Sequence, residues 1–222
     1  MQKSESLNKS KNNLFYCILL AVLTLISVFV TYKLSSGITI SFDTSYQYFL
    51  NEKDWGNLMP LIVKDYSPPL YTFILKIYST IFGADMSVLR FFYAIPLFGM
   101  LSLILFPLRK LIGGKAAIIA AVLTTFSSIN FFFFDDIRPT LLGVFTATGC
   151  NVFALACYRE NKKRDYIGLS IFTVLSMYSH TIAMLVAAGA FLTLLILFGF
   201  KKNSNGIKRV LISGGICSLI YI

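Results

Sequence analysis

Apolar blocks long enough to cross a lipid bilayer recur along the whole chain, and this feature constrains its fold most. About 20 consecutive apolar residues span the hydrocarbon core as a helix. Hydrophobic residues make up 56% of the sequence and charged residues 14%, a balance too apolar for a water-soluble domain. We therefore expect an all-α, polytopic membrane protein with about seven transmembrane helices, the last one incomplete. Their expected ranges are 14–34, 88–108, 115–134, 139–156, 166–178, 181–200 and 210–222.

The distribution of Lys and Arg predicts the orientation of these helices. If the N-terminus is cytoplasmic, most of the 20 Lys and Arg residues fall on the cytoplasmic side, as the positive-inside rule requires. Residues 1–13 then form a disordered cytoplasmic tail, and most acidic residues lie outside. The net charge of +10 thus reflects topology, and no basic stripe interleaved with aromatic residues indicates a nucleic-acid partner. The inner cations are Lys3, Lys9, Lys11, Arg109, Lys110, Lys115, Arg159, Lys162, Lys163, Arg164, Lys201, Lys202, Lys208 and Arg209.

The longest segment between expected spans, residues 35–87, forms the first outer loop. Within it, Pro69–Gly83 is apolar but only about 15 residues long, too short to cross a bilayer. Its apolar positions follow helical spacing with polar positions opposite, which predicts a helix lying in the membrane interface. Counting it as a crossing would also move Arg109, Lys110 and Lys115 outside. We expect one transmembrane module over residues 14–222, with interfacial helices in this loop.

Asp43 is the first acidic residue of the outer loop, in the segment Ser-Phe-Asp-Thr-Ser-Tyr. One interpretation is structural, because an Asp before a short helix can serve as its N-cap. The other is functional, because a carboxylate just beyond a membrane helix can accept a proton from a hydroxyl or orient it.

Asp135-Asp136-Ile137-Arg138 lies where the third expected helix leaves the membrane. The simpler interpretation is a solvated loop with a local Asp–Arg pair. The alternative is that Arg138 binds a lipid phosphate through paired donors while Asp136, together with Asp135, orients a sugar or binds a metal ion.

His180 is the only histidine and falls at the turn between the fifth and sixth expected helices. A lone histidine at such a turn is commonly a structural, hydrogen-bonded residue. Because the turn is on the same side as the acids, His180 is also a candidate for contacting a phosphate or a metal ion.

Several short motifs, taken in order, carry a resemblance to a known family. The chain resembles the GT-C superfamily of polytopic glycosyltransferases, above all its protein-O-mannosyltransferase and aminoarabinose-transferase branch. It departs from that pattern at Thr44, where the family often has a second acid, and at Ser67, where a His or Lys usually precedes the paired prolines. The matching motifs are Asp43, Pro68-Pro69-Leu70, Phe82-Gly83, Val88-Leu89-Arg90, Asp136-Ile137-Arg138 and Tyr178-Ser179-His180.

The resemblance implies a membrane glycosyltransferase of the cell membrane, with its active site on the outer face. It implies a polyprenyl-phosphate-linked sugar as donor, a hydroxyl of a protein, lipid or glycan as acceptor, and the N-terminal part of a longer enzyme. Asp43 would be the catalytic residue. The substrate-binding residues would be Asp135, Asp136, Arg138, His180 and Ser67, with a divalent metal ion at Asp136 and His180 as a further hypothesis.

Two other interpretations stay open. The chain could be part of a transporter or flippase, although such proteins favour charged or broken helices near the membrane midplane, and these helix interiors are nearly uncharged. It could also be a truncated, inactive glycosyltransferase remnant, because the last apolar block stops short of a full span.

Overall fold

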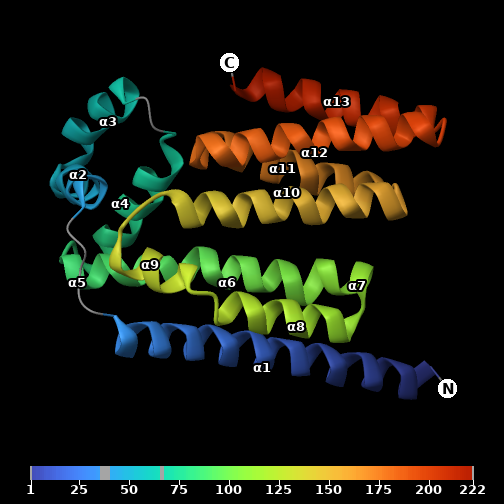
Figure 1. Ribbon diagram of the computed structural model, residues 1–222, viewed down its shortest axis with the longest axis horizontal. Coiled ribbons are helices and arrows are strands. Elements are labelled where there is room, and N and C mark those ends of the chain that lie inside the picture. The colour runs from blue at the N-terminus through green and yellow to red at the C-terminus, as the bar shows by residue number, and fades with distance from the viewer. Residues whose placement is uncertain (1, 36–40, 66–67, 222) are drawn as a thin grey trace.

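The computed structural model describes residues 2–35, 41–65 and 68–221, and all regular structure in these ranges is helical. Long helices lie side by side, and the short helices α2 to α5 gather at one end of the bundle (Figure 1). The helices are α1 (Gln2–Leu34), α2 (Phe42–Glu52), α3 (Trp55–Lys64), α4 (Leu70–Phe82), α5 (Met86–Leu89), η1 (Arg90–Tyr93), α6 (Ala94–Leu103), η2 (Ile104–Leu108), α7 (Arg109–Ile112), α8 (Gly114–Thr125), α9 (Ile129–Asp135), α10 (Thr140–Glu160), α11 (Lys163–Ser179), α12 (Thr181–Phe200) and α13 (Ser204–Tyr221).

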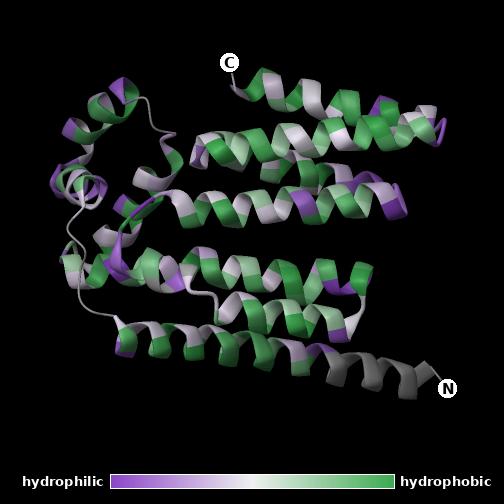
Figure 2. Ribbon diagram, viewed as in Figure 1, coloured by the Kyte–Doolittle hydropathy of each residue, from purple (hydrophilic) through white to green (hydrophobic). Residues whose placement is uncertain are grey.

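Four helical runs in the described residues are long and apolar enough to cross a membrane. They are Asn13–Leu34, Met86–Ile112, Thr140–Glu160 and Thr181–Phe200, and they coincide with four of the expected spans. Hydrophilic residues gather towards the two ends of the bundle, as Figure 2 shows. The all-α fold is therefore confirmed for the described part of the chain, and the helices are those of a multi-pass membrane protein. The number of crossings and their orientation stay predictions.

The chain reverses direction between successive long helices, which sorts its turns into two groups (Figure 1). The turn at Gly113, the turn at Asn161 and the turn after α12 lie at the same end as the N-terminus. The α9–α10 segment and the α11–α12 turn lie at the other end, beside the short helices. The expected grouping of cation-rich turns at one end and candidate site residues at the other thus agrees with the bundle.

The third expected helix, 115–134, is wrong as a continuous element, because it breaks between α8 and α9. Asn130 is fully buried at this break, and its Nδ2 donates hydrogen bonds to the carbonyls of Thr124 at 2.8 Å and Thr125 at 3.0 Å. The Ser27 hydroxyl of α1 also donates to the Thr125 carbonyl, at 3.3 Å. A membrane helix can end inside a bundle only where such partners replace its lost backbone bonds.

Three helix boundaries also differ from the expectation. The expectation of a disordered tail is wrong, because α1 begins at Gln2. Extending a helix that has already formed costs less free energy than nucleating a new one. Helix α11 runs from Lys163 to Ser179, and its 17 residues extend beyond both ends of the expected helix 166–178. Helix α13 begins at Ser204, before the expected Val210, because the Asn203 side chain accepts a hydrogen bond from the Gly206 amide at 3.0 Å. Helix α13 has 18 residues but is not one of the four helical runs that are long and apolar enough to cross a membrane, so the incomplete last span stays a prediction.

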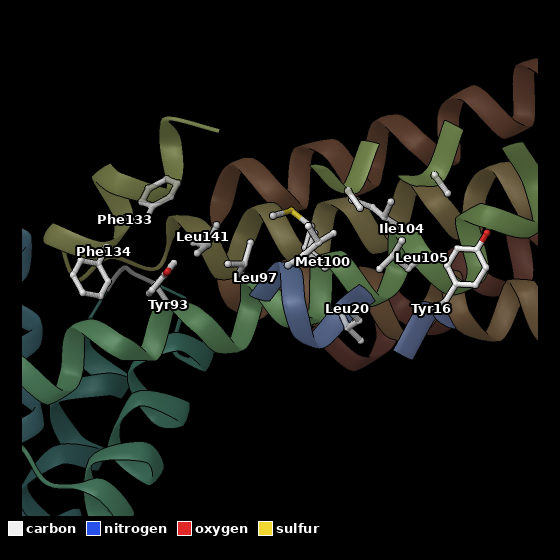
Figure 3. Close-up of a cluster of buried hydrophobic side chains, with 14 residues drawn as sticks. Tyr16, Leu20, Tyr93, Leu97, Met100, Ile104, Leu105, Phe133, Phe134 and Leu141 are labelled. Carbon is white, nitrogen blue, oxygen red and sulfur yellow. The ribbon is translucent and has the colours of Figure 1, made fainter. Parts of the chain in front are cut away.

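A cluster of buried apolar side chains joins α1 to the helices that follow the outer loop. The side chains of this cluster, most of them labelled in Figure 3, come from α1, η1, α6, η2, α8, α9 and the start of α10. Leu97, Leu101 and Leu105 of α6 and η2 are fully buried at its centre. This packing fixes α9, and with it the segment that leads from α9 into α10. Its labelled members are Tyr16, Leu20, Tyr93, Leu97, Met100, Ile104, Leu105, Phe133, Phe134 and Leu141.

Helix α4 packs one side, which includes Leu75, against the protein and leaves an apolar side exposed. Thr72 and Ser79 are buried, whereas Phe73, Ile77 and Ile81 are exposed. Thr72 donates a hydrogen bond to the Gln47 side chain of α2 at 3.0 Å, which ties the two outer helices together. Its 13 residues extend only about 20 Å at 1.5 Å per residue, too little for a crossing. This arrangement suits the expected interfacial helix, because lipid would cover the exposed apolar side.

Candidate active site

Asp136 is a buried carboxylate on the segment between α9 and α10, and it attaches that segment to the start of α2. Its side chain is 2% exposed. Oδ1 accepts hydrogen bonds from the hydroxyls of Ser41, at 2.7 Å, and Thr44. Oδ2 lies against Arg138 Nε in an ion pair that lacks hydrogen-bond geometry. A buried carboxylate requires such partners, so Asp136 links the outer loop to the membrane helices.

Thr44 occupies the position where the family often has a second acid. It is fully buried, its hydroxyl donates to Asp136, and the same oxygen accepts a hydrogen bond from the Ile137 amide at 3.2 Å. A carboxylate at position 44 would meet Asp136 as a like charge in a buried place and could not donate to it. A threonine at position 44, where the family often has an acid, therefore suits the buried carboxylate of Asp136.

Asp43 lies in the first turn of α2 and is not its N-cap, so the structural interpretation of this residue is wrong. The N-cap is Ser41, whose side chain accepts a hydrogen bond from the Thr44 amide at 3.1 Å. The Asp43 carboxylate is instead 53% exposed, and its Oδ2 lies 3.4 Å from Arg138 Nη1. Arg138, at 32% exposure, therefore bridges a buried acid and an exposed one.

The neighbouring acid, Asp135, belongs to a second ion pair. Arg90 Nη2 lies 3.0 Å from Asp135 Oδ1, and the Ser35 hydroxyl contacts both groups. The guanidinium carbon of Arg90 lies 4.1 Å from the centre of the Phe134 ring. The two consecutive acids thus contact two different arginines. The local Asp–Arg pair of the simpler interpretation is confirmed for Asp136 and Arg138, but Asp136 is buried, so the solvated loop is wrong for this residue.

Arg90 is the site residue whose role the sequence did not reveal. In the sequence it stands out only as part of the motif Val88-Leu89-Arg90, at the start of the apolar block after the outer loop. Its signal was a single cation at the outer end of an otherwise apolar block, a location that is costly unless the charge is paired.

Tyr71 of α4 lies beneath this network. Burial, and secondly the charge of Asp136, raises the pKa of the Tyr71 hydroxyl, so it stays protonated at neutral pH. Tyr71, Arg90 and Arg138 line a cavity of only about 10 Å³. A single water needs roughly 10–15 Å³, so no substrate fits below the network. Asp43 and the exposed edge of Arg138 are therefore the side open to a ligand.

His180 lies at the same end of the bundle, at the turn between α11 and α12. Its Nδ1 accepts a hydrogen bond from the Ile182 amide at 3.2 Å and so caps α12. A Cβ added at Gly143 of α10 would approach the His180 Cβ to 2.6 Å. Burial lowers the pKa of His180, which favours the neutral imidazole. The cap hydrogen bond confirms a structural role for His180. Among the described residues no hydrogen bond or ion pair joins His180 to Asp43 or Asp136, and its functional role stays a prediction.

The proposed metal contacts find limited support in the described residues. No three His, Cys, Asp or Glu side chains there come together as a ligand set. Both oxygens of Asp136 already have protein partners, and a metal ion would have to displace them. Ser67 lies outside the described residues, so its substrate-binding role also stays a prediction.

The chain matches a known protein family. Residues 66–222 match the family described as dolichyl-phosphate-mannose-protein mannosyltransferase. The comparisons with curated proteins and with solved structures gave no match. The matched range covers most of the chain and includes α4 and α6 to α13. The resemblance inferred from the sequence motifs is therefore confirmed.

Proposed function

This chain belongs to the dolichyl-phosphate-mannose-protein mannosyltransferase family, and from this premise we propose that it transfers a sugar from a polyprenyl-phosphate-linked donor to an acceptor hydroxyl. The acceptor oxygen attacks the anomeric carbon of the sugar, and the bond from that carbon to the phosphate oxygen breaks. The polyprenyl phosphate leaves with the bonding electron pair, and the hydroxyl proton passes to a base. Family membership favours this chemistry over the transporter alternative.

The observation that supports the proposal most is the pairing of Asp43 with Arg138. Asp43 is the exposed carboxylate of the network, so it can reach an acceptor hydroxyl and take its proton. Arg138 is next to it and can contact the phosphate on which negative charge develops. A guanidinium presents paired donors that suit phosphate oxygens. Fixed positive charge at the position where negative charge appears is commonly the largest contribution to catalysis.

The buried acids serve this arrangement as positioning groups. Asp136 holds the Nε side of Arg138, which leaves the terminal guanidinium nitrogens able to turn from Asp43 to a phosphate. Asp135 contacts the terminal Nη2 of Arg90, and both side chains of that pair are mostly buried. We assign both acids an indirect part in sugar and phosphate binding, and His180 a supporting part at the neighbouring turn.

The reaction is proposed for the outer face of the membrane, with the N-terminus in the cytoplasm. Acceptors with a free hydroxyl on a protein, a lipid or a glycan are all compatible with this chemistry. Sidedness is tested with single cysteines at positions 43 and 202 in a variant whose exposed Cys17 is replaced by serine. A membrane-impermeant thiol reagent applied outside should label position 43 and spare position 202. Labelling of both positions from the same side contradicts the topology.

The transfer itself is tested in proteoliposomes that contain the full chain and a radiolabelled polyprenyl-phosphate sugar, with mannose as the first sugar. Replacing Arg138 with Lys keeps the charge but loses the paired donors, so we expect a higher KM for the donor. Replacing Lys53 with Arg, at the other end of α2, is the matched control. Donor use that is equal in wild type and Arg138→Lys would remove Arg138 from the phosphate site. Uptake of a tracer without any glycosylated product would instead favour transport.

A further inference from the structure

A second charged site lies at the end of the bundle opposite Asp43, where α7, α10 and the start of α11 meet (Figure 1). Together with the end of η2, these helices form an open-sided cavity of about 280 Å³. A water molecule takes up roughly 30 Å³ in the liquid, so the cavity is suited to a group much larger than an ion. The wall residues that matter are Pro107, Lys110, Phe153, Glu160, Arg164 and Asp165.

The apolar and charged walls of this cavity are separated along the membrane normal. Pro107 and Phe153 belong to the spans Met86–Ile112 and Thr140–Glu160, within their apolar parts. The charged residues lie at the ends of these spans or just beyond them. A ligand that fills the whole cavity must therefore be amphiphilic, with its polar group at the membrane surface.

The carboxylate of Asp165 indicates which hydrogen-bonding group the polar part of the ligand must carry. Its side chain is 7% exposed, and its Oδ1 lies 3.5 Å from Arg164 Nε. Its Oδ2 is buried and has no hydrogen-bond partner among the described residues. Buried carboxylate oxygens are normally satisfied, so this position calls for an added N–H or O–H donor.

The other charges indicate that the ligand also carries a negative group. Lys110 lines the cavity, is exposed and forms no ion pair in the described part of the chain. Arg164 lies beside it and contacts Glu160 at 3.3 Å. A simple anion would meet Asp165 and Glu160 as like charges, and a simple cation would meet Lys110 and Arg164 as like charges. A zwitterion with a donor-bearing cation and a phosphate matches both signs.

We propose that this cavity binds the phosphoethanolamine headgroup of a membrane lipid. The ammonium group donates to Asp165 Oδ2, with Glu160 nearby, and the phosphate pairs with Lys110 and Arg164. The acyl chains lie along the apolar wall formed by Pro107 and Phe153. The site is at the other end of the bundle from the transfer site, so it does not depend on the proposed glycosyl transfer.

The test measures lipid binding to the purified full chain in detergent by native mass spectrometry. The probes are phosphatidylethanolamine, phosphatidylcholine and phosphatidylglycerol with identical acyl chains, and soluble phosphoethanolamine. Phosphatidylcholine keeps the charges but has no N–H donor, so we expect it to bind about tenfold more weakly, as for loss of one charge-assisted hydrogen bond.

Two variants examine the two halves of the site. Asp165→Asn should remove the preference for ethanolamine over choline, and Lys110→Gln should weaken binding of all phosphate headgroups. Glu52→Gln in α2 and Lys208→Gln in α13 are matched controls away from the cavity and should bind as wild type does. Lys110 is exposed, so its variant gives an answer even if Asp165→Asn fails to fold.

Equal binding of phosphatidylethanolamine and phosphatidylcholine by the wild type would overturn the proposal. So would unchanged binding in Lys110→Gln. If soluble phosphoethanolamine binds as tightly as the lipid, the ligand is a free headgroup, and the lipid assignment is wrong.

Discussion

Replacing Asp43 or Asp136 with Asn makes the same chemical change at two acids that contact the same arginine, and we expect opposite results. Each substitution removes one negative charge and keeps the shape of the side chain. Asp43 is exposed beside Arg138, whereas Asp136 is buried behind it. Asp43→Asn should therefore abolish sugar transfer in a folded protein, and Asp136→Asn should destabilise the outer helices.

The effect on stability follows from the exposure of each pair. At 53% and 32% exposure and 3.4 Å, the Asp43–Arg138 pair is a surface ion pair. Such pairs contribute about 0.2–1 kcal/mol, so the loss of Asp43 should cost less than about 1 kcal/mol. Asp136 is 2% exposed and also accepts two hydroxyl hydrogen bonds. Breaking a buried pair costs about 3–5 kcal/mol, and the partial exposure of Arg138 places the expected loss near 3 kcal/mol.

The effect on activity follows from the proposed role of Asp43 as a base. Removing a general base lowers the rate by about 10²- to 10⁴-fold. The measurement compares turnover from a radiolabelled polyprenyl-phosphate sugar with the amount of folded protein in the same membranes. Glu52→Gln, at the other end of α2, is the control for a lost charge on the same helix.

Tryptophan fluorescence provides the matching readout for folding. Trp55 is the only tryptophan, and its ring lies 5.4 Å from that of Phe73 across α3 and α4. Its emission therefore reports on the outer helices that Asp136 attaches to the bundle. Transfer that survives Asp43→Asn would refute the proposed base. A melting temperature of Asp136→Asn equal to that of Asp43→Asn would refute the reasoning from burial.

Three further predictions concern the helices that hold the site. Gly143→Ala should destabilise the protein by about 1–3 kcal/mol in thermal unfolding, because the added Cβ would meet His180. Gly189→Ala has open space around the added Cβ and should be neutral or stabilising. Equal melting temperatures of the two variants would contradict this. Asn130→Leu should cost about 1–3 kcal/mol in urea unfolding against the wild type, because the buried carbonyls of Thr124 and Thr125 each lose a side-chain donor. Burial lowers the pKa of His180 below 6.5, so the unfolded chain binds a proton more readily than the folded one. The free energy of unfolding should therefore fall as the pH drops below about 6.5. This pH dependence should disappear in His180→Gln.

Much of the site was accessible from the sequence because charges are rare in membrane helices. An acid or an arginine at the end of an apolar block costs free energy unless it has a partner or a function, so Asp43, Asp135, Asp136 and Arg138 were conspicuous. Their joint location at one end followed from counting crossings. The pairing itself did not follow, because it depends on which side chains face each other after the outer loop folds back. Arg90, for example, reaches Asp135 across 45 positions of the chain.

Local sequence thus determined that the chain is a helical membrane protein, which end of the bundle holds the candidate chemistry, and which family the motifs resemble. Hydrophobic length and charge distribution are properties of each segment alone, so they can be read without a fold. Tertiary structure decided that Asp136 is buried and Asp43 exposed, that Thr44 supports the first of these, and that the third helix breaks at Asn130. Burial and hydrogen bonding are properties of the packed neighbours, which lie far away in the sequence.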